Sequence, residues 1–477
     1  MNKKFAEFLS WMDQKNIAVV GMGISNRPLI EILAKRGLKL TVFDALTEDA
    51  EPVRILKAEY AKSGYDINWQ LGPDYLEKLK GFDLIFRTPS LMPYREQIIR
   101  EKERGALVTS EMEVFLHCCP GQTFGITGSD GKSTTTSLTY SMLKAQGFET
   151  YIGGNIGRPL LSDLDQMTAD AKVVVELSSF QLVDMTLSPN VSILTNVTPN
   201  HLNIHKDLAD YVTAKKQIYR HQKLGDRLIL NGLCPEFAAD RFEVKSEITW
   251  FNDRYPGCRQ MVFVEKAGQL GFRARNSEVF EPVCPTSDLH IMGNFNRQNV
   301  LAAMAATHDF VETTNMAKAV ASFKGLEHRL EFVREIAGVK YYNSSIDSSP
   351  ERSKHSIAAF SEAGKNLVLI MGGKDKNCDY SGLGKIIAGA TDRLILCGAN
   401  ADLITNAVRL EAGQAGKTLA QIQIVTCHDY PEAVAVAQSL AGVGDSVLLS
   451  PAGTSFDQFS NFMERGQVFK HLVNQLR

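Results

Sequence analysis

One short turn constrains the fold of this chain more than any other feature. Residues 128–133 read GSDGKS, directly after the apolar run 123–127 and directly before a stretch with helical character. Glycines let backbone N–H groups face phosphate oxygens, and the N-terminus of the following helix adds partial positive charge. Ile126 stands where the usual phosphate loop has its first glycine, so the turn is a variant of that loop.

The side chains of this turn suit a nucleotide. Lys132 can bridge the outer phosphates, and the hydroxyl of Ser133 or Thr134 can bind Mg²⁺. A plain strand-to-helix turn without a ligand is the alternative, and the position of the turn between a strand and a helix favours the phosphate loop.

The composition is that of an ordinary folded protein. Of the 477 residues, 44% are hydrophobic and 22% are charged, which excludes a disordered or collagen-like chain. The net charge of −2 argues against a protein that coats nucleic acid. No apolar run approaches the ~20 residues that cross a bilayer, so we expect no membrane insertion. The eight cysteines have no zinc-site spacing, which indicates reduced thiols and a cytoplasmic protein.

Strands and helices alternate along almost the whole chain, which predicts α/β domains with largely parallel sheets. At about 150 residues per domain, we expect three domains, at 1–118, 119–323 and 324–477. The first and third are predicted to be Rossmann-like, and the central one to hold a parallel sheet of the phosphate-loop ATPase type. Residues 243–285 are rich in β-forming and aromatic residues and are interpreted as a strand insertion. Predicted strands lie at 17–23, 38–44, 82–90, 171–179, 191–197 and 226–232, and others begin near residues 339, 367, 393, 422 and 446. Residues 107–113 are interpreted as a strand-to-helix step.

Two further strand ends carry residues that suit a ligand. Gly21 and Gly23 begin like a dinucleotide fingerprint, but Asn26 stands where the third glycine belongs. A tight turn without a ligand explains them equally well. Glu176 ends the apolar run KVVVE, and an acid at the carboxyl edge of a parallel strand beside a phosphate loop is well placed to bind Mg²⁺. A surface acid is the alternative there.

Four other residues carry weaker signals. His201 follows a strand and can serve a second metal or a phosphate, whereas His205 looks similar by pattern, and a packing role stays open for both. Lys215 lies in a helical stretch, and its spacing alone indicates a solvated lysine. Asn296 and Asn299 lie three residues apart and can read an adenine edge or cap a helix.

Together these motifs resemble the Mur ligase superfamily, and within it the branch that adds D-glutamate to UDP-N-acetylmuramoyl-L-alanine. The resemblance covers nearly the whole chain. It implies an ATP-dependent acid–amino-acid ligase of cytoplasmic peptidoglycan precursor synthesis, which serves cell shape and division and acts as a monomer. The segments that carry the resemblance are GMGIS (21–25), TGSDGKST (127–134), GGNIG (153–157), ELSSFQL (176–182), NVTPNH (196–201), AK (214–215), GNFNRQN (293–299), HR (328–329), GGKDK (372–376) and SPAGTSFDQFSNFMERG (450–466).

The resemblance also implies a role for individual residues, with ATP and Mg²⁺ as cofactors. The implied catalytic residues are Lys132, His201 and Lys215. The implied ATP contacts are Gly128, Ser129, Asp130, Gly131, Lys132, Ser133, Thr134, Asn296, Asn299 and Arg329. The implied metal ligands are Ser133, Glu176, His201 and Lys215, the last if it is carbamylated. The UDP substrate is expected at Ile24, Ser25 and Asn155, and D-glutamate at Ser348, Lys376, Ser455 and Phe462.

One segment departs from the family pattern. Where the family often reads NDSKATN, residues 343–349 read NSSIDSS. Ser344 therefore replaces an Asp associated with the ATP ribose, and Ile346 replaces a Lys. Asp347 is a candidate to take over the lost acidic role, but from a different place on the chain.

Several alternatives stay open at this point. The same chemistry with L-glutamate or another acceptor is one, because both enantiomers present the same two carboxylates. A non-catalytic, nucleotide-binding scaffold of the same fold is another. A nicotinamide-dependent oxidoreductase built on Gly21 and Gly23 leaves the loop at Lys132 unexplained. A folylpolyglutamate-type ligase lacks the first nucleotide domain, whereas this chain has a long segment before the phosphate loop.

Overall fold

The chain is an α/β protein whose described strands form three sheets. The computed structural model describes residues 2–198, 204–234, 244–252, 260–362, 364 and 366–477. Contacts divide the chain into two units, one formed by residues 1–286 and 298–320 and the other by 287–297 and 321–477. The three sheets confirm the predicted fold class, whereas the domain boundaries at 118/119 and 323/324 stay predictions.

The first sheet contains five parallel strands in the order β3-β2-β1-β4-β5. All four residues of β1 are buried, because an apolar strand in a parallel sheet is covered on both faces. The strand order reverses between β1 and β4, and ligands of open parallel sheets bind at such a switch point. The elements are α1 (Lys3–Met12), β1 (Ile17–Val20), α2 (Arg27–Lys35), β2 (Leu40–Asp44), α3 (Glu51–Lys62), β3 (Ile67–Leu71), η1 (Tyr75–Lys78), β4 (Leu84–Arg87), α4 (Glu96–Glu103), β5 (Leu107–Thr109) and α5 (Glu111–Cys118).

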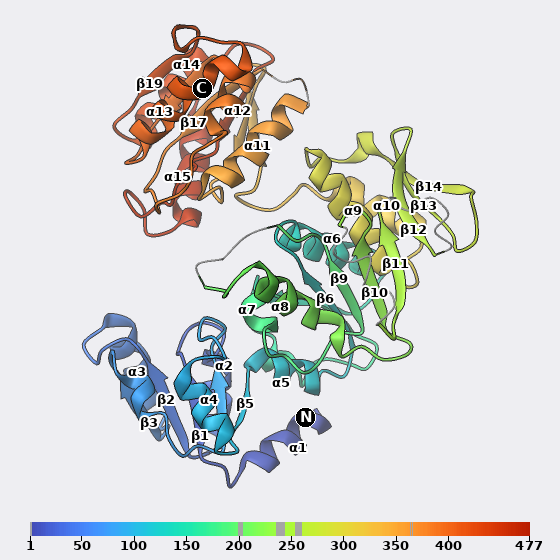
Figure 1. The fold of residues 1–477 in the computed structure, drawn as a ribbon, viewed down its shortest axis with the longest axis vertical. Coiled ribbons are helices and arrows are strands. Elements are labelled where there is room, and N and C mark those ends of the chain that lie inside the picture. Colours follow the sequence, from blue (N-terminus) through green and yellow to red (C-terminus); the bar gives the residue numbers. More distant parts are fainter. Residues whose placement is uncertain (1, 199–203, 235–243, 253–259, 363, 365) are drawn as a thin grey trace. The chain divides into compact units, whose positions relative to one another are not determined.

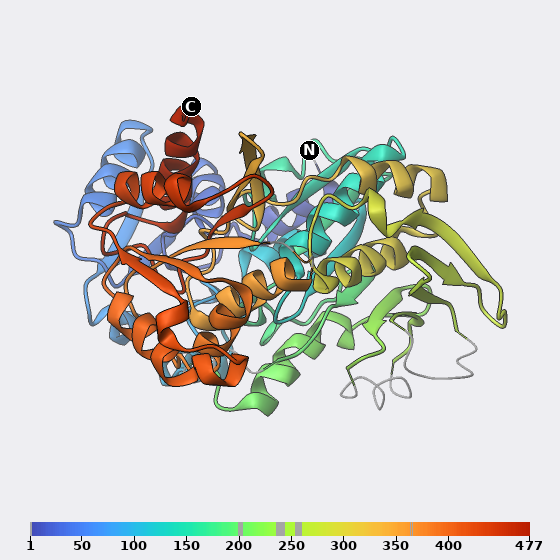
Figure 2. The same cartoon turned by 90° about the horizontal axis from the view of Figure 1, so that it is seen from above.

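The second sheet has nine strands in the order β14-β13-β12-β11-β10-β9-β6-β8-β7. The strands from β7 to β12 run parallel, and β13 and β14 close the far edge as antiparallel strands. Figure 2 shows this edge in yellow-green. The elements are β6 (Gln122–Thr127), α6 (Lys132–Ala145), β7 (Thr150–Gly154), η2 (Leu161–Asp163), β8 (Lys172–Glu176), α7 (Ser179–Leu182), β9 (Val191–Leu194), α8 (Leu208–Arg220), β10 (Arg227–Asn231), β11 (Glu247–Phe251), β12 (Val262–Lys266), β13 (Gln269–Arg273), β14 (Phe280–Pro285), η5 (Thr286–Asp288), α9 (Asn294–Thr307) and α10 (Thr313–Ser322).

The described part of the segment interpreted as a strand insertion belongs to this sheet. Strand β11 pairs in parallel with β10, and β12 pairs with β11, so these strands extend the central sheet instead of forming a separate layer. Helix α6 packs on β6, β7 and β8, and helix α8 packs on β6 and β9. The turn between β6 and α6 therefore lies near the middle of the sheet.

A buried arginine joins the first two sheets within the first unit. Arg87 ends β4, and its guanidinium forms an ion pair with Asp184. It also donates to the carbonyl oxygens of Phe180, at 3.2 Å, and Leu91, at 3.2 Å. Helices α2 and α5 pack against η2 and extend this contact with apolar side chains. The end of β4 is thus fixed beside helix α7, which follows Glu176.

The second unit is built on a six-stranded sheet in the order β15-β16-β20-β17-β18-β19. All strand pairs are parallel except the edge pair β15 and β16. Strands β17 and β20 are buried throughout, which agrees with their apolar sequences LVLIM and SVLL. The elements are β15 (Glu331–Ile336), β16 (Val339–Asn343), α11 (Pro350–Glu362), β17 (Leu367–Met371), α12 (Leu383–Ala390), β18 (Arg393–Leu396), α13 (Ala401–Glu411), η6 (Ala412–Ala415), η7 (Leu419–Gln421), β19 (Gln423–Thr426), α14 (Tyr430–Leu440), β20 (Ser446–Leu449) and α15 (Phe462–Gln475).

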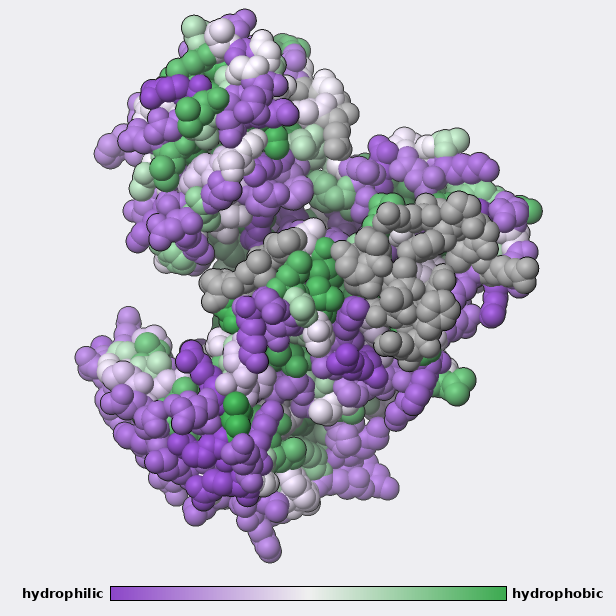
Figure 3. Space-filling model, viewed as in Figure 1, coloured by the Kyte–Doolittle hydropathy of each residue, from purple (hydrophilic) through white to green (hydrophobic). Residues whose placement is uncertain are grey.

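The described helices include no candidate membrane span. Within these residues, none of the helices has both the length and the apolar character that a bilayer crossing requires. The face drawn in Figure 3 is mainly hydrophilic, with smaller hydrophobic patches between the polar side chains.

Candidate active site

The turn between β6 and α6 can form only with glycine at two positions. Gly131 precedes the first residue of α6 and has φ +80°, and Gly128 has φ +153°. A Cβ atom at Gly128 would lie 1.8 Å from Oγ1 of Thr195, and a Cβ at Gly131 would lie 2.2 Å from Oδ1 of Asn299. Both backbone conformation and close approach therefore exclude other residues here.

The end of β9 anchors the loop. The N–H of Ser129 donates to the carbonyl of Asn196 at 2.9 Å, and the N–H of Asp130 donates to the Oδ1 atom of Asn196 at 2.9 Å. The Thr195 hydroxyl donates to the carbonyl of Asp130 at 2.6 Å. The Ser129 hydroxyl shares a 3.0 Å hydrogen bond with the Tyr211 hydroxyl. With these contacts made, the first turn of α6 is the anion-binding end of the loop.

Two lysine amines meet at this loop. Nζ of Lys132 donates to the carbonyl oxygens of Gly128 and Ser129, both at 2.9 Å. Nζ of Lys215 donates to the same Gly128 oxygen at 2.7 Å and lies 4.5 Å from the centre of the Tyr211 ring. Lys215 is only 1% exposed, so the solvated lysine indicated by its spacing is wrong.

Burial changes the protonation chemistry of Lys215. Desolvation holds the pKa of Lys215 well below its ordinary value, and the positive charge of Lys132 lowers it further. The carboxylates of Asp130 and Glu176 oppose this shift. The net shift makes the neutral, nucleophilic amine easier to reach than in a solvated lysine.

A carboxylate with a spare oxygen lies at the end of β8. Asn155 donates from Nδ2 to Oε1 of Glu176 at 2.8 Å, and its own N–H donates to the Glu176 carbonyl at 2.8 Å. The Oε2 atom of Glu176 is buried and has no hydrogen-bond partner among the residues that the structure describes. A buried carboxylate oxygen without a partner is costly unless a ligand binds it. Carboxylate and hydroxyl oxygens suit Mg²⁺, so Glu176 and Ser133 fit this ion.

The two histidines have different outcomes. His201 lies outside the described residues. The side chain of His205 is buried, and its ring nitrogens form hydrogen bonds with Asp210 and Ser179, each at 2.9 Å. The ring stacks on Phe180. His205 is therefore a hydrogen-bonded packing residue.

The two asparagines of α9, Asn296 and Asn299, form different contacts. Asn299 accepts a 3.3 Å hydrogen bond from the Thr135 hydroxyl and lies against Gly131, so it contacts the phosphate loop. Asn296 donates from Nδ2 to the carbonyl of Met292 at 2.7 Å, as a residue that steadies a helix start does. Asn299 therefore lies beside the loop and the first turn of α6.

The first glycine turn is closed by side chains. Asn26 donates from Nδ2 to the carbonyls of Val20, at 3.1 Å, and Gly21, at 2.9 Å, so it occupies the place of a third glycine. Oδ2 of Asp44 accepts from the N–H of Met22 at 2.9 Å. Ile24 is 72% exposed beside this turn, with Ser25 next to it. A side chain fills the space that a dinucleotide fingerprint leaves open, which disfavours the nicotinamide alternative.

In the second unit, one buried arginine holds together the segments predicted to bind glutamate. Arg465 donates to the carbonyl of Ser345 at 2.8 Å and to that of Gly453 at 3.1 Å. The Ser345 hydroxyl donates to the carbonyl of Phe462 at 2.7 Å. Arg465 was not among the predicted site residues, although it lies within the closing segment 450–466.

Lys376, Ser455 and Ser348 are the remaining residues that were predicted to bind glutamate. Residues 374 and 454 pair as a β-bridge, which brings the chain at Lys376 near that at Ser455. Ser348 lies on the turn after β16 that also carries Ser345. Ser348, Lys376 and Ser455 therefore lie on loops of the second unit, and Phe462 begins helix α15.

Comparison with known proteins agrees with this geometry. Residues 126–307 match the family model of the Mur ligase middle domain, and residues 328–453 match that of the Mur ligase glutamate ligase domain. A protein of Acetivibrio thermocellus is 44% identical, and one of Ruminiclostridium cellulolyticum is 43% identical, each over 100% of both chains. The chain belongs to the Mur ligase family. Both relatives are named UDP-N-acetylmuramoylalanine–D-glutamate ligase, which confirms the branch predicted from the sequence.

Solved Mur ligases share the fold at lower identity. UDP-N-acetylmuramate-alanine ligase MurC of Thermotoga maritima aligns with a TM-score of 0.55 and 17% identity, over 97% of this chain and 99% of that one. MurF of Thermotoga maritima, solved in complex with ADP, aligns with a TM-score of 0.54 and 17% identity, over 98% of this chain and 97% of that one. These likenesses establish the fold of a Mur ligase for the full chain.

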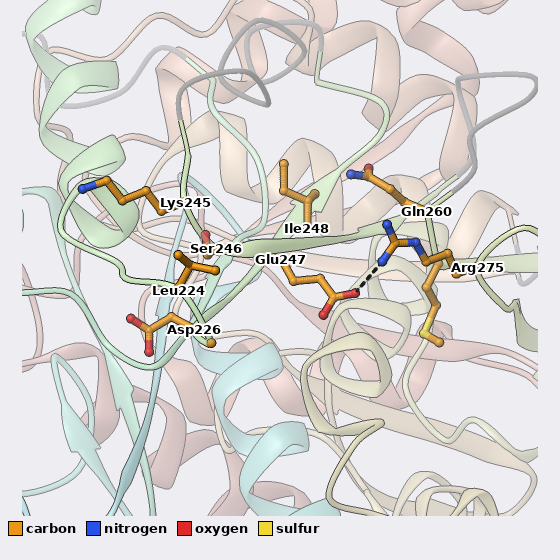
Figure 4. Close-up of a pocket in the computed structure, with 10 residues that line it drawn as sticks. Leu224, Asp226, Lys245, Ser246, Glu247, Ile248, Gln260 and Arg275 are labelled. Atoms are coloured by element: carbon orange, nitrogen blue, oxygen red, sulfur yellow. Dashed lines mark ion pairs between the residues drawn. The ribbon is translucent and has the colours of Figure 1, made fainter.

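One further hollow in this Mur ligase lies away from the predicted site (Figure 4). It has a volume of about 400 Å³ and lies at the amino-terminal ends of β10 and β11, beside Asp226 and Glu247. Glu247 and Arg275 face each other there at 3.6 Å, and both side chains are exposed. Ligands of parallel sheets bind at the opposite, carboxyl edge, and no predicted site residue lines this hollow.

Proposed function

We propose that the protein joins D-glutamate to UDP-N-acetylmuramoyl-L-alanine with cleavage of ATP, as a step of peptidoglycan precursor synthesis. The observation that carries this proposal is the 44% identity, over the full length of both chains, to a relative named for that reaction. Three described features of the loop support the chemistry: its two required glycines, its paired lysines and the spare oxygen of Glu176.

The loop is the proposed ATP phosphate site. The N-terminus of α6 supplies N–H groups and partial positive charge, and Lys132 adds a full charge at the same place. Lys132 exchanges its bonds to the Gly128 and Ser129 carbonyls for phosphate oxygens. That exchange offsets the repulsion between a substrate carboxylate and the γ-phosphate.

Glu176 and Ser133 are the proposed Mg²⁺ ligands in the described residues, with His201 as a further ligand. The ion, when bound, neutralises charge on the phosphates. Asn155 holds one oxygen of Glu176, so the other oxygen keeps a fixed direction for the metal.

Lys215 is the proposed site of carbamylation. A neutral amine adds to CO₂, forming an N–C bond and releasing one proton, and the product is an anion. The lowered pKa of Lys215 favours this step, because less free energy is needed to form the neutral amine. The carbamate replaces the positive charge of Lys215, beside Lys132, with a negative charge. That negative charge is stabilised only beside a cation such as Mg²⁺.

The proposed reaction has two steps. The carboxylate of UDP-N-acetylmuramoyl-L-alanine attacks the γ-phosphorus of ATP, and ADP leaves. The amine of D-glutamate then attacks the acyl carbon and loses a proton, and phosphate leaves with the C–O bond electrons. Ile24 and Ser25 are proposed to hold the UDP end. Ser348, Lys376, Ser455 and Phe462 are proposed to receive the glutamate. A cytoplasmic monomer is the proposed form, since ATP and UDP-linked precursors are cytoplasmic.

Phosphate release tests this function directly. The purified protein is incubated with Mg²⁺, ATP and UDP-N-acetylmuramoyl-L-alanine, together with D-glutamate, L-glutamate or neither. We expect release only with D-glutamate. Release only with L-glutamate would mean that the acceptor is L-glutamate and that the ligase reaction itself is unchanged. No release in any tube, with ATP still bound, overturns the ligase and favours a nucleotide-binding scaffold.

A further inference from the structure

The side chain of His205 is fully buried, and the proposed reaction gives it no role. Its Nδ1 atom forms a 2.9 Å hydrogen bond with Asp210, and its Nε2 atom forms one of 2.9 Å with the hydroxyl of Ser179. Because a carboxylate only accepts hydrogen bonds, Nδ1 of the neutral ring donates to Asp210 and Nε2 accepts from Ser179. These two bonds fix the direction of the ring, which an apolar side chain of similar size cannot do.

The two hydrogen bonds of His205 join two helices. Ser179 begins α7, and Asp210 lies in the first turn of α8. Helix α7 follows strand β8, which ends at Glu176, whereas α8 carries Lys215. His205 therefore holds the start of the helix that carries the buried lysine against the helix that follows the predicted metal ligand.

The ring of His205 also packs on Tyr211, which lies one helical turn before Lys215. The centres of the His205 and Tyr211 rings are 5.2 Å apart, and the angle between the ring planes is 69°. Phe180 stacks on His205 with ring centres 5.4 Å apart and an angle of 10°. Tyr211 therefore packs edge to face on a ring that hydrogen bonds and stacking already hold in place.

Tyr211 in turn contacts two groups at the phosphate loop. The Ser129 hydroxyl donates to the carbonyl of Thr198 at 2.9 Å, so its single proton is already used. The Tyr211 hydroxyl is therefore the donor in its 3.0 Å hydrogen bond with Ser129. Nζ of Lys215 lies over the Tyr211 ring, 4.5 Å from its centre. One tyrosine thus contacts both a hydroxyl of the loop and the buried amine.

We propose that His205 is a positioning residue that holds the ring of Tyr211 in place at the phosphate loop. Through Tyr211 it fixes the positions of the Lys215 amine and the Ser129 hydroxyl. This inference rests on the proposed function, because it takes Lys215 as part of the reaction. The effect should appear in kcat, which depends on the position of Lys215, more than in ATP binding, which the N-terminus of α6 also supports.

The variant His205→Phe removes both hydrogen bonds and keeps an aromatic ring. ADP formation is measured with Mg²⁺, ATP, UDP-N-acetylmuramoyl-L-alanine and D-glutamate, below the Tm of every variant. The dissociation constant of Mg-ATP is measured by calorimetry. We expect His205→Phe to lower kcat by about tenfold or more, because a small displacement of a reacting group has effects of that size. The Mg-ATP constant should change much less. An unchanged kcat, or a loss of ATP binding as large as the loss of kcat, overturns the proposal.

His308→Phe is the matched control. His308 lies in the same unit and also packs on aromatic rings, those of Phe263 and Phe272, with ring centres 5.5 and 4.6 Å away. These two rings belong to β12 and β13, and β9, β10 and β11 lie between those strands and β6 in the sheet. His308→Phe should therefore change Tm and leave kcat near that of the wild type. An equal fall of kcat in both variants overturns a specific role of His205.

A double-mutant cycle tests whether His205 acts through Tyr211. Tyr211→Leu removes the ring and the hydroxyl and keeps an apolar side chain at this buried position. If Tyr211 carries the effect, His205→Phe should lower the kcat of Tyr211→Leu much less than it lowers that of the wild type. Equal losses in the two backgrounds overturn the proposal.

Crystal structures of the wild type and His205→Phe test the positioning without any reference to activity. In His205→Phe we expect the hydrogen bond between Tyr211 and Ser129 to be lost. The amine of Lys215 should also move away from the carbonyl oxygen of Gly128. Contacts that stay at 3.0 and 2.7 Å overturn the proposal. If the wild type forms no ADP, the ligase function fails, and these two structures alone decide the role of His205.

Discussion

The amines of Lys215 and Lys132 donate to one acceptor, the carbonyl oxygen of Gly128, at 2.7 and 2.9 Å. Two amines that share one oxygen cannot both carry a full charge without repulsion. Desolvation lowers the pKa of the buried Lys215 well below its ordinary value, and the neighbouring charge of Lys132 lowers it further. Burial and this close contact together therefore make the neutral form of Lys215 easier to reach than that of a solvated lysine.

Replacement of Lys215 tests its part in the reaction. We expect Lys215→Ala to lower kcat by about a hundredfold or more, because a preorganised charge next to the phosphates is lost. Added short carboxylic acids should restore part of the activity by filling the space with an anion. The neighbouring Lys216→Ala is the control and should retain activity. Full activity in Lys215→Ala would contradict the proposed role.

The two ends of α6 allow a matched test of the loop geometry. Gly131 and Gly147 both have positive φ, +80° and +96°, but only Gly131 lies against another side chain, that of Asn299. Gly147→Ala should cost about 1 kcal/mol of unfolding free energy from backbone strain alone. Gly131→Ala should cost more and should also weaken ATP binding. Denaturant unfolding and calorimetry measure the two effects, and equal losses in both variants would refute a special role for Gly131.

The ion pair that joins the first two sheets should contribute strongly to stability. Arg87 is buried, so Asp184→Ala leaves a buried charge short of its partner, and we expect a loss of about 3 kcal/mol. The pair of Arg36 and Asp13 is more exposed, and Asp13→Ala should cost much less than Asp184→Ala. Urea denaturation of both variants provides the comparison. A loss in Asp184→Ala no greater than that in Asp13→Ala would show that the carbonyls around Arg87 suffice.

Stability should fall with pH because of one buried carboxyl group. Desolvation raises the pKa of Glu111 to about 8 in the folded chain, above the ordinary 4.5. The folded state therefore holds the proton that the unfolded state releases, and the cost of folding grows as the pH rises from 4.5 to about 8. Glu111→Gln should raise Tm at pH 8 and leave it unchanged near pH 4.5. The exposed Glu103→Gln is the control, and a gain in Glu111→Gln that does not depend on pH would contradict this assignment.

Most buried strands could be predicted from the sequence, because an apolar run between glycines has few other interpretations. The predictions for β1, β2, β8, β10 and β17 are confirmed. The edge strands β3 and β15 were not predicted, because edge positions are only half-buried and their sequences lack an apolar run. The strand β7 was also not predicted, since its short sequence ends in two glycines.

The candidate site was predictable where backbone conformation sets the residue type. Gly128 and Gly131 are required by the turn itself, so the pattern was visible. Lys215 was not visible in this way, because its burial depends on Gly128, a residue 87 positions away in the chain. Arg465 was not visible either, because the carbonyl oxygens that accept its hydrogen bonds come together only when the chain folds. Contacts of this kind leave no periodic trace in a sequence.

The acceptor that unites Lys132 and Lys215 is a main-chain oxygen, and this has an evolutionary consequence. No amino-acid replacement can delete a carbonyl group, and the close approach of Thr195 already restricts position 128 to glycine. Selection can therefore adjust only the donors, by altering the reach, charge or modification of each amine. The oxygen of Gly128 is thus a fixed acceptor, and because the two amines share it, a change in the charge of one lysine also alters the electrostatic environment of the other.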